Sequence, residues 1–478
     1  MAGDKTPLGN APRLESVPYR GLDSQSRDSI TMVPSPGRGD AAEFPLLILL
    51  GSVDRPAPDA RQRLIPFERT LLIGRHGPKE RAPEVAGWVV KDRMISGQHA
   101  RITENDGGDW ELTDLESRNG TVVDGVSAES ALKLRNGSLI FVGGHVAVFR
   151  TATEPQIAAI RAELGKPFGP VATTNPQFAL TCAMLRKLAD TDGEVLLTGE
   201  TGVGKEVYAN AIHEESGRKG KFVAVNCAAL PRELVESELF GYLRGAHSQA
   251  SGPKGGIIEE AEGGTLFLDE IGDMAPELQT KLLRFTQDRM LTPVGGTRPR
   301  RIDVRILAAT SRTAPPVAGQ GGLRADLAAR LGAEPVRIPP LRDRIEDLGA
   351  MGGHLLGVQS KPLELLALQA LTLYSWPGNV RELQKVLITA AALSRGAERI
   401  SASHLPQAIA AGPSRVRSSP AGRATRPPPT AIELEELIRR FEGNMLRVSR
   451  ELDRKPALIY RWAKRFSIKI DNYRRKDE

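Results

Sequence analysis

The stretch LLTGETGVGKEV (196–207) has the pattern of a short apolar strand, a glycine-rich loop and the first turn of a helix. Its glycines allow backbone N–H groups to turn toward phosphate oxygens, and the following helix adds the positive end of its dipole. Lys205 supplies a point charge for the outer phosphates. The spacing therefore predicts a phosphate-binding loop with these members: Gly199, Glu200, Thr201, Gly202, Val203, Gly204, Lys205 and Glu206.

A second motif, GGTLFLDE (263–270), supports a nucleotide site, because it is an apolar strand that ends in two acidic residues. Asp269 is placed to hold a magnesium ion and Glu270 to polarise the attacking water. The two motifs together predict ATP and Mg²⁺ as cofactors. One position departs from the usual pattern: Glu206 stands where such loops carry Ser or Thr as a magnesium ligand.

The chain has 478 residues, 40% hydrophobic and 26% charged, as in a soluble globular protein of about three domains. Its densest apolar run, FPLLILLG (44–51), is far too short to span a bilayer, and two cysteines provide no disulfide framework. We therefore expect a cytoplasmic protein with no membrane partner. Residues 412–478 hold 17 Lys and Arg against 9 Asp and Glu. Such a basic tail indicates nucleic-acid contact, although a solvated face explains the charge equally well.

Hydrophobic patterning divides the first part of the chain into three segments. Residues 1–43 show no hydrophobic period and are predicted to be disordered. Within 44–152, short apolar stretches alternate with turns, which is typical of an all-β sandwich or barrel. Residues 153–168 are predicted to form a short helical linker.

The second part of the chain begins with strands that alternate with helices over 169–340, which predicts an α/β subdomain with a parallel sheet covered by helices. Residues 341–410 are predicted to be mostly helical. Residues 411–430 are rich in Pro, Arg and Ser and indicate a flexible linker, and 431–470 indicate a final all-α unit. The predicted fold class is therefore multidomain.

Eight segments between about Gly169 and Leu405 read GETGVGKE, FVAVNCAAL, ESELFGY, GGTLFLDEIGDM, KLLRF, LRADLAARL, PPLRDRIEDL and WPGNVREL. Together they resemble the AAA+ domain of the bacterial enhancer-binding proteins, which are sigma-54-dependent transcriptional activators. The resemblance implies a P-loop ATPase subdomain followed by a helical lid. It also accounts for Glu206, because a Glu commonly ends the phosphate loop in this family.

The same resemblance implies roles for five further residues. Arg324 and Arg330 match the arginines that reach the ATP of a neighbouring subunit, which implies a ring, expected to be a hexamer. Arg381 matches the sensor II arginine of the lid. Asn226 matches the residue that switches the catalytic Glu toward or away from water. Thr310 matches the first sensor, but it is followed by Ser where the family usually has Asn.

The amino-terminal module carries LLIGRHG (71–77), ISGQHARI (95–102) and LTDLESRNGTVVDG (112–125), in the order and spacing of a forkhead-associated (FHA) domain, which it resembles. Such domains bind phosphothreonine peptides from loops at one end of a β-sandwich. By this resemblance, the guanidinium of Arg75 donates to the phosphate dianion of phosphothreonine. Ser96 donates a hydroxyl hydrogen bond, and Asn119 fixes the peptide backbone.

Two other residues of these loops are interpreted differently. His99 is expected to be structural and to brace the loops. Gly97 stands where the family usually has a basic residue, and Arg118 is the candidate that compensates for it. A sandwich that keeps the fold but has lost phosphate binding stays an open alternative.

The segment ELEELIRRFEGNMLRVSRELDRKPALIYRWAKRFSI (433–468) resembles the Fis-type helix-turn-helix that ends these activators. Its recognition helix is expected from about Pro456, with an apolar face of Leu458, Ile459, Trp462 and Phe466. The candidates for contact with upstream DNA lie off that face: Lys455, Arg461, Lys464 and Arg465. A basic three-helix packing module is the alternative.

The segment GAHSQA lies between the two nucleotide motifs, where the family inserts a loop reading GAFTGA that grips sigma-54. Its members are Gly245, Ala246, His247, Ser248, Gln249 and Ala250. The His adds polarity, the Ser lacks a methyl group, and the Gln blocks the positive φ that Gly allows. We therefore expect normal ring assembly and ATP hydrolysis, with weak or absent engagement of sigma-54.

The sequence thus predicts a signal-dependent transcription regulator. Its FHA module would sense a phosphothreonine protein or segment, its AAA+ ring would hydrolyse ATP to remodel sigma-54 RNA polymerase, and its tail would bind upstream DNA. Two alternatives stay open: a DNA-binding AAA+ regulator that does not engage sigma-54, and a phosphopeptide-binding adaptor with a vestigial ATPase. ATPase activity separates the adaptor from the others, and open-complex formation separates the two regulators.

Overall fold

The computed structural model describes residues 29–31, 43–54, 63–78, 85–231, 234–245, 252–311, 322–332, 334–357, 361–410 and 431–441, and five single residues after these. The chain divides into two compact units, Met1–Val416 and Arg417–Glu478, and each is described by itself. Among the helices of these described ranges, none is both long and apolar enough to cross a bilayer.

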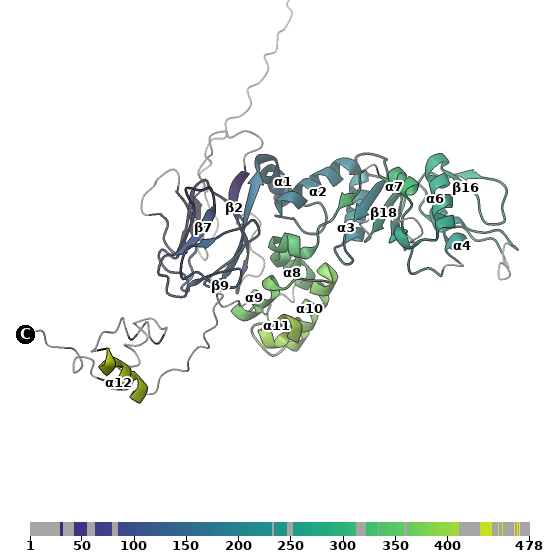
Figure 1. Ribbon diagram of the computed structural model, residues 1–478. Coiled ribbons are helices and arrows are strands. Elements are labelled where there is room, and N and C mark those ends of the chain that lie inside the picture. Colours follow the sequence, from purple (N-terminus) through teal and green to yellow (C-terminus); the bar gives the residue numbers. More distant parts are fainter. Residues whose placement is uncertain are drawn as a thin grey trace, which may run out of the picture. The chain divides into compact units, whose positions relative to one another are not determined.

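The first unit begins with a sandwich of two six-stranded sheets (Figure 1). One sheet has the order β1 (Ser29–Thr31), β5 (Val85–Val89), β4 (Thr70–Gly74), β6 (Ala100–Glu104), β7 (Trp110–Asp114) and β10 (Leu132–Lys133). The other has the order β3 (Leu64–Pro66), β2 (Glu43–Ser52), β12 (His145–Thr153), β11 (Leu139–Val142), β8 (Thr121–Val123) and β9 (Val126–Ser127). Alternating apolar side chains such as Leu47, Ile73 and Phe149 meet between them, which confirms the predicted all-β sandwich.

The prediction that residues 1–43 are disordered is wrong at Ser29–Thr31. These residues form strand β1, which pairs antiparallel with β5 from Ser29 opposite Val89 to Thr31 opposite Gly87. Three residues are too few to show a hydrophobic period. Their backbone partners are in β5, more than fifty residues later in the sequence. Glu43 already belongs to β2, and the rest of the segment lies outside the described residues.

After helix α1 (Glu154–Gly165), the ATPase subdomain contains a five-stranded sheet in which every pair is parallel. Its order is β14 (Phe222–Asn226), β15 (Thr265–Asp269), β18 (Arg305–Thr310), β13 (Val195–Thr198) and β19 (Val336–Arg337). Its longer helices are α2 (Pro176–Ala189), α3 (Lys205–Ser216), α6 (Pro276–Asp288) and α7 (Ala325–Leu331). The short elements are α4 (Val235–Phe240), α5 (Ile257–Glu260), η2 (Ile271–Asp273), β16 (Met290–Leu291) and β17 (Arg300–Arg301).

Buried apolar side chains cover both faces of this sheet, which explains why its central strands are mostly apolar. Successive side chains of a strand point to opposite faces. In β13, Leu196 belongs to one hydrophobic cluster and Leu197 to another, and in β15 Leu266 and Phe267 divide in the same way. The predicted α/β architecture is confirmed.

Parallel pairing brings the polar ends of several strands to one edge of the sheet. Thr198, which precedes the phosphate loop, lies opposite Thr310 at the end of β18. Asn226 at the end of β14 lies opposite Asp269 at the end of β15. The carboxyl edge of a parallel sheet is where ligands bind in such folds, so the register itself gathers the predicted site residues.

Both cysteines are free and buried. Cys182 lies in α2 and is 1% exposed, and Cys227 directly follows β14 and is 4% exposed. Burial raises the pKa of both thiols, that of Cys227 to about 12. Neither side chain is therefore a thiolate at neutral pH.

The lid follows β19 and consists of η3 (Leu341–Asp347), α8 (Leu348–Leu356), α9 (Leu365–Leu373), α10 (Asn379–Leu393), η5 (Ala402–His404) and α11 (Gln407–Ala410) (Figure 1). Its core is centred on side chains such as Leu371 and Trp376. Leu50, Phe141 and Val148 of the sandwich belong to the same cluster. The helical lid is confirmed, and it shares its apolar core with the outer face of a β-sheet.

The second unit is described only in part. Helix α12 (Ala431–Arg440) supplies Leu434 and Ile438 to a small apolar cluster that also contains Val448, Leu452 and Ala463. Phe466 packs against this cluster. The predicted linker at 411–430 lies outside the described residues, as do the expected DNA contacts and three residues of the expected apolar face: Lys455, Arg461, Lys464, Arg465, Leu458, Ile459 and Trp462.

Candidate functional site

The phosphate loop connects β13 to α3, and its shape requires glycine at two positions. Gly202 and Gly204 have φ of +83° and +100°, a region that side chains disfavour. A Cβ on Gly202 would also lie 2.5 Å from the carbonyl oxygen of Gly378 in the lid. The backbone of the loop can therefore turn its N–H groups inward while the lid packs directly against it.

Lys205 is the first residue of α3 and is 6% exposed. Its ammonium group donates to the carbonyl oxygen of Gly199 at 3.0 Å and to Oε1 of Glu270 at 3.2 Å. The ion pair joins the two sequence motifs across the edge of the sheet. A phosphate group in the loop would compete with Glu270 for the same ammonium.

Glu270 directly follows β15 and has a left-handed backbone, with φ of +52°. Its Oε2 accepts hydrogen bonds of 2.9 Å from both the backbone N–H and the hydroxyl of Ser311. Partial burial acts to raise the pKa of Glu270, but these two bonds and the charge of Lys205 lower it below its usual value. The Glu270 carboxylate is therefore ionised at neutral pH.

Ser311 contacts the predicted catalytic Glu270, a pairing that the sequence motifs do not indicate. The resemblance assigned control of Glu270 to Asn226, but the amide oxygen of Asn226 accepts from the backbone of Ala228 at 3.0 Å. Thr310, the predicted first sensor, is 3% exposed at the end of β18. The sequence signal for Ser311 is that it stands where the family usually has Asn.

A cavity of about 420 Å³ lies above these residues and brings most of the predicted nucleotide site together. Its described lining comprises Thr201, Gly202, Gly204, Lys205, Glu206, Val207, Asn226, Asp269, Glu270, Asp273, Ser311, Val380, Arg381 and Gln384. Val207, Asp273, Ser311, Val380 and Gln384 were not predicted. The last two lie in α10 with Arg381, so the lid closes one side of the cavity.

The acidic residues of the cavity fit a magnesium ion bound together with phosphates. Burial raises the pKa of Asp269, an effect that the charge of Lys205 opposes. Within the described ranges, His, Cys, Asp and Glu form no group of three that could hold a metal alone. Mg²⁺ commonly uses one or two carboxylates plus substrate phosphates and waters, and Asp269 and Asp273, which line the same cavity, offer such carboxylates.

The lid is tied to the phosphate loop by polar contacts. Arg342 donates to both carboxylate oxygens of Glu200, and the Asn379 side chain donates to Glu200 Oε2 and to the Thr201 carbonyl at 3.1 Å. Hydrogen bonds from Arg342 and Asn379 lower the pKa of Glu200 to about 2. The backbone N–H of Arg381 donates to the Gly202 carbonyl at 3.3 Å. Glu200, predicted as an ATP contact, here holds the lid.

Arg324 and Arg330 are not among the described residues that line the cavity of their own chain. Arg324 is exposed and its guanidinium donates to both carboxylate oxygens of Asp326, at 3.0 and 2.8 Å. Arg330 lies at the end of α7 and donates to the Thr286 carbonyl at 3.0 Å. Their predicted role toward a neighbouring subunit stays a prediction.

A second group of predicted residues meets at one end of the sandwich. The backbone N–H of Arg75 donates to the Ser96 carbonyl at 2.9 Å, and the Ser96 hydroxyl accepts from the N–H of Arg118 at 3.0 Å. The side-chain amide of Asn119 donates to the Met94 carbonyl at 2.6 Å. Three loops are thereby joined, and the side chains of Arg75, Arg118 and Asn119 are exposed.

His99 is fully buried beneath these loops, as expected of a structural brace. Its Nδ1 accepts from the backbone N–H of Ser96 at 3.0 Å, and Nε2 lies 3.2 Å from the Gly120 carbonyl oxygen. Because Nδ1 accepts, the proton is on Nε2, which donates to Gly120. His99 therefore links the loop that contains Ser96 to the loop that contains Gly120.

The predicted sigma-54 loop is described only at its first residue. Gly245 has φ of +80°, a backbone conformation that glycine adopts readily. Its five other members lie outside the described residues: Ala246, His247, Ser248, Gln249 and Ala250.

Three known families match the chain. The sigma-54 interaction domain matches residues 171–337, the FHA domain residues 71–143 and the AAA+ ATPase lid domain residues 342–421. Nitric oxide reductase transcription regulator NorR1 of Cupriavidus necator is 38% identical over 361 residues, which are 68% of this chain and 70% of NorR1. The chain belongs to the family of sigma-54-dependent transcription regulators. It is an activator of the NtrC/NorR type that carries an FHA domain.

The chain is also similar to NtrC and NtrX proteins, and the matched share of each differs. The transcriptional regulator NtrC of Bradyrhizobium sp. is 47% identical over 231 residues, 47% of this chain and 48% of NtrC. Among solved structures, NtrX from Brucella abortus in complex with ATP is 30% identical and has a TM-score of 0.45, covering 66% of this chain and 73% of that chain. The chain thus spans about half the length of NtrC.

Replacing His99 tests the bracing of the sandwich loops. His99→Ala leaves the Ser96 N–H and the Gly120 carbonyl unsatisfied, which should lower the free energy of unfolding by about 1–3 kcal/mol for each group. The thermal unfolding transition of the FHA domain should shift downward, whereas the exposed His76→Ala should leave it in place. Equal midpoints for the two variants would contradict the bracing role.

Proposed function

We propose that this protein is an ATP-dependent transcription regulator that binds upstream DNA, hydrolyses ATP in a ring of subunits and thereby remodels sigma-54 RNA polymerase. Phosphothreonine recognition by the FHA domain would control it. The observation that carries the proposal is the meeting of Lys205, Asp269 and Glu270 around one cavity at the carboxyl edge of the sheet.

In the proposed reaction, the loop N–H groups and Lys205 bind the phosphates of ATP. Asp269 would hold Mg²⁺, which would supply positive charge to neutralise the phosphates. Glu270 orients and deprotonates the attacking water. Because Lys205 and Ser311 occupy its carboxylate in the free site, Glu270 must exchange at least one of these partners for water. Arg381 on the lid faces the same cavity and would contact the outer phosphates.

Assembly into a ring, proposed to be hexameric, would complete the site. Arg324 is the exposed residue that immediately precedes α7. Among the described contacts its guanidinium donates to Asp326 alone, so it is accessible to a neighbour. A guanidinium supplied across an interface stabilises charge in the phosphoryl-transfer transition state. Arg330 is proposed to serve the same interface.

Control by phosphothreonine rests on the loop cluster of the sandwich. Arg75 and Arg118 present two guanidinium groups, and Asn119 presents an amide, on loops that hydrogen bonds hold together. Two guanidinium forks suit the dianion of a phosphothreonine. Because Gly97 contributes no cation, we expect modest affinity.

A second candidate function is favoured by the loop at 245–250. Its His, Ser and Gln differ from the residues with which the family grips sigma-54, so the protein would assemble and hydrolyse ATP but engage sigma-54 weakly. The basic residues proposed to contact DNA, Lys455, Arg461, Lys464 and Arg465, would then act in a regulator that does not remodel polymerase.

The nucleotide site is tested with two substitutions. Lys205→Ala should abolish ATP binding, because it removes the buried cation of the loop. Glu270→Gln should keep ATP binding and lower kcat by about 100-fold or more, because it removes the general base. A fluorescent ATP analogue and a phosphate-release assay measure the two effects. Glu277→Gln, exposed on α6, is the matched control, and parent-like hydrolysis in both site variants would refute the assignment.

The phosphopeptide site is tested by calorimetry with a degenerate phosphothreonine library and its unphosphorylated counterpart. The full chain should bind only phosphorylated peptides. Arg75→Ala should weaken that binding by about 10-fold or more, because it removes a charged hydrogen bond. Arg101→Ala, exposed on the face of β6, should bind like the parent. The absence of any binder would assign the sandwich a structural role.

The sigma-54 loop is tested by restoring the family's residues. His247→Phe, Ser248→Thr and Gln249→Gly together should raise open-complex formation by purified sigma-54 holoenzyme, because they restore the apolar contact and the flexible tip. The rate of ATP hydrolysis should stay at the parent value. Strong open-complex formation by the unmodified protein would overturn the view that the loop engages sigma-54 weakly.

A further inference from the structure

Segment η3 joins the last strand of the ATPase subdomain to the first lid helix, and it contacts two different parts of the protein. Its seven residues, LRDRIED (341–347), include three acids and two arginines. The arginines reach the phosphate loop, whereas two of the acids reach the FHA domain. The segment is therefore a direct physical connection between these regions.

The contacts with the phosphate loop come from Arg342 and Arg344. Arg342 pairs with Glu200, as described above. Arg344 is fully buried, and its guanidinium donates to the Val203 carbonyl at 2.8 Å and to the Tyr208 hydroxyl at 3.2 Å. Both partners of Arg344 lie within the loop or the first turn of the helix after it. The position of η3 thus fixes the position of the phosphate loop.

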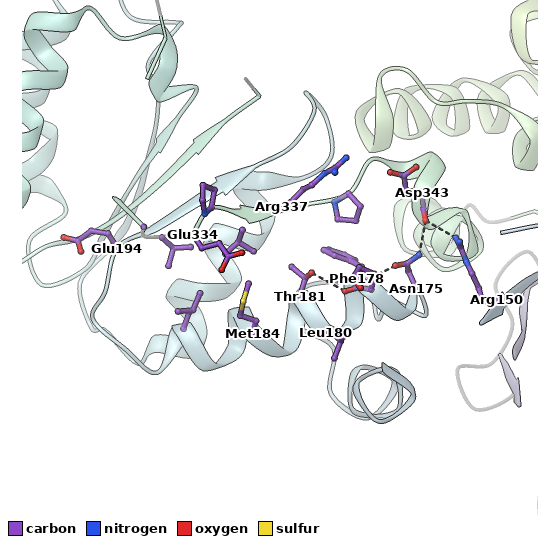
Figure 2. Close-up of a pocket in the computed structure, with 17 residues that line it drawn as sticks. Arg150, Asn175, Phe178, Leu180, Thr181, Met184, Glu194, Glu334, Arg337 and Asp343 are labelled. Atoms are coloured by element: carbon purple, nitrogen blue, oxygen red, sulfur yellow. Dashed lines mark hydrogen bonds between the residues drawn. The ribbon is translucent and has the colours of Figure 1, made fainter. Parts of the chain in front are cut away.

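The contacts with the FHA domain come from Arg150 in β12 and Arg63 just before β3. Arg150 donates to both oxygens of Glu346, at 3.0 and 2.8 Å, and to the Asp343 carbonyl at 2.9 Å. Figure 2 shows the Arg150 side chain reaching Asp343 at the end of a cavity of about 830 Å³. Arg63 donates to the Glu346 carbonyl at 2.8 Å and lies 3.8 Å from Asp347.

These contacts matter because the carboxylates are adjacent and excluded from water. The side chains of Glu346 and Asp347 are 0% and 1% exposed. Burial and the neighbouring charge of Glu346 raise the pKa of Asp347, and Arg63 and Arg344 oppose that rise. Within the ATPase subdomain, the described donors to the pair are neutral, the hydroxyls and amides of residues 173–175. Without the FHA arginines, Arg344 would be the nearest cation left to balance two buried charges.

We propose that Arg63 and Arg150 are positioning residues of the nucleotide site, through which the FHA domain holds η3 and thereby sets the affinity of the phosphate loop for ATP. The inference rests on the proposed ATPase function and deepens it. Neither arginine touches nucleotide; each acts through Glu346 or Asp347, and these act through Arg342 and Arg344.

The test compares the full chain with Arg150→Gln, Glu346→Gln and the double variant. Each single change should raise the KM for ATP and the Kd of a fluorescent ATP analogue by about 2- to 30-fold, the range of coupling carried by such networks. The double variant should show no further rise, because one connection has been cut. All measurements are made well below the lowest thermal midpoint, so that every variant is folded.

Two further variants separate positioning from general stability. Arg150→Lys keeps the charge without the two-pronged geometry and should recover part of the affinity. Asp54→Ala removes the exposed ion pair of Asp54 with Arg399, a second link between sandwich and lid that does not involve η3, and should leave KM and Kd at parent values. If Arg150→Gln does not fold, the inference is tested by comparing KM and Kd between Arg150→Lys and Asp54→Ala: it requires higher values in Arg150→Lys.

The outcomes distinguish this inference from the proposed function. If the parent hydrolyses ATP and the Arg150 and Glu346 variants have the same KM and Kd as the parent, the inference is overturned and the proposed function stands. If the parent protein binds the analogue but does not hydrolyse ATP, the proposed hydrolysis is refuted. The inference is then tested by comparing the Kd of the analogue between the parent and the variants. A parent that binds no nucleotide overturns both.

Discussion

Two adjacent carboxylates, those of Glu346 and Asp347, are buried where the sandwich, the ATPase subdomain and the lid meet. A low-dielectric interior does not tolerate such charges without partners. The sandwich provides two arginines, and the ATPase subdomain provides hydroxyl and amide donors from residues 173–175. The three modules therefore share one charge balance, the sandwich and the lid also share an apolar core, and the geometry of the nucleotide site depends on that balance.

The parts of the fold that follow from local patterning could be predicted. Short alternating apolar stretches gave the sandwich, and strand–helix alternation gave the parallel sheet, because burial on one or two faces leaves a direct trace in the residue order. The nucleotide site was also accessible, since Lys205 and Glu270 sit in motifs whose strands must end at the same edge. Here a local pattern determines a long-range arrangement.

The remaining features depend on partners that no local pattern reveals. Arg150 and Glu346 are 196 residues apart, and the contact of Arg63 with the Glu346 backbone spans 283 residues. Neither arginine occupies a recognisable motif. Ser311 holds Glu270 partly through its backbone N–H, a donor that nearly every residue type carries. Strand β1 is equally inconspicuous, because three residues cannot display a period.

The two cysteines have a consequence for how this molecule can be observed. Both thiols are buried within the ATPase subdomain and are protonated at neutral pH, so they react slowly with maleimides and iodoacetamides. If one surface cysteine were introduced on the sandwich and one on the lid, these two would therefore be labelled selectively with fluorophores, and the native cysteines could stay in place. Energy transfer between such dyes would report the separation of the two modules while nucleotide is added.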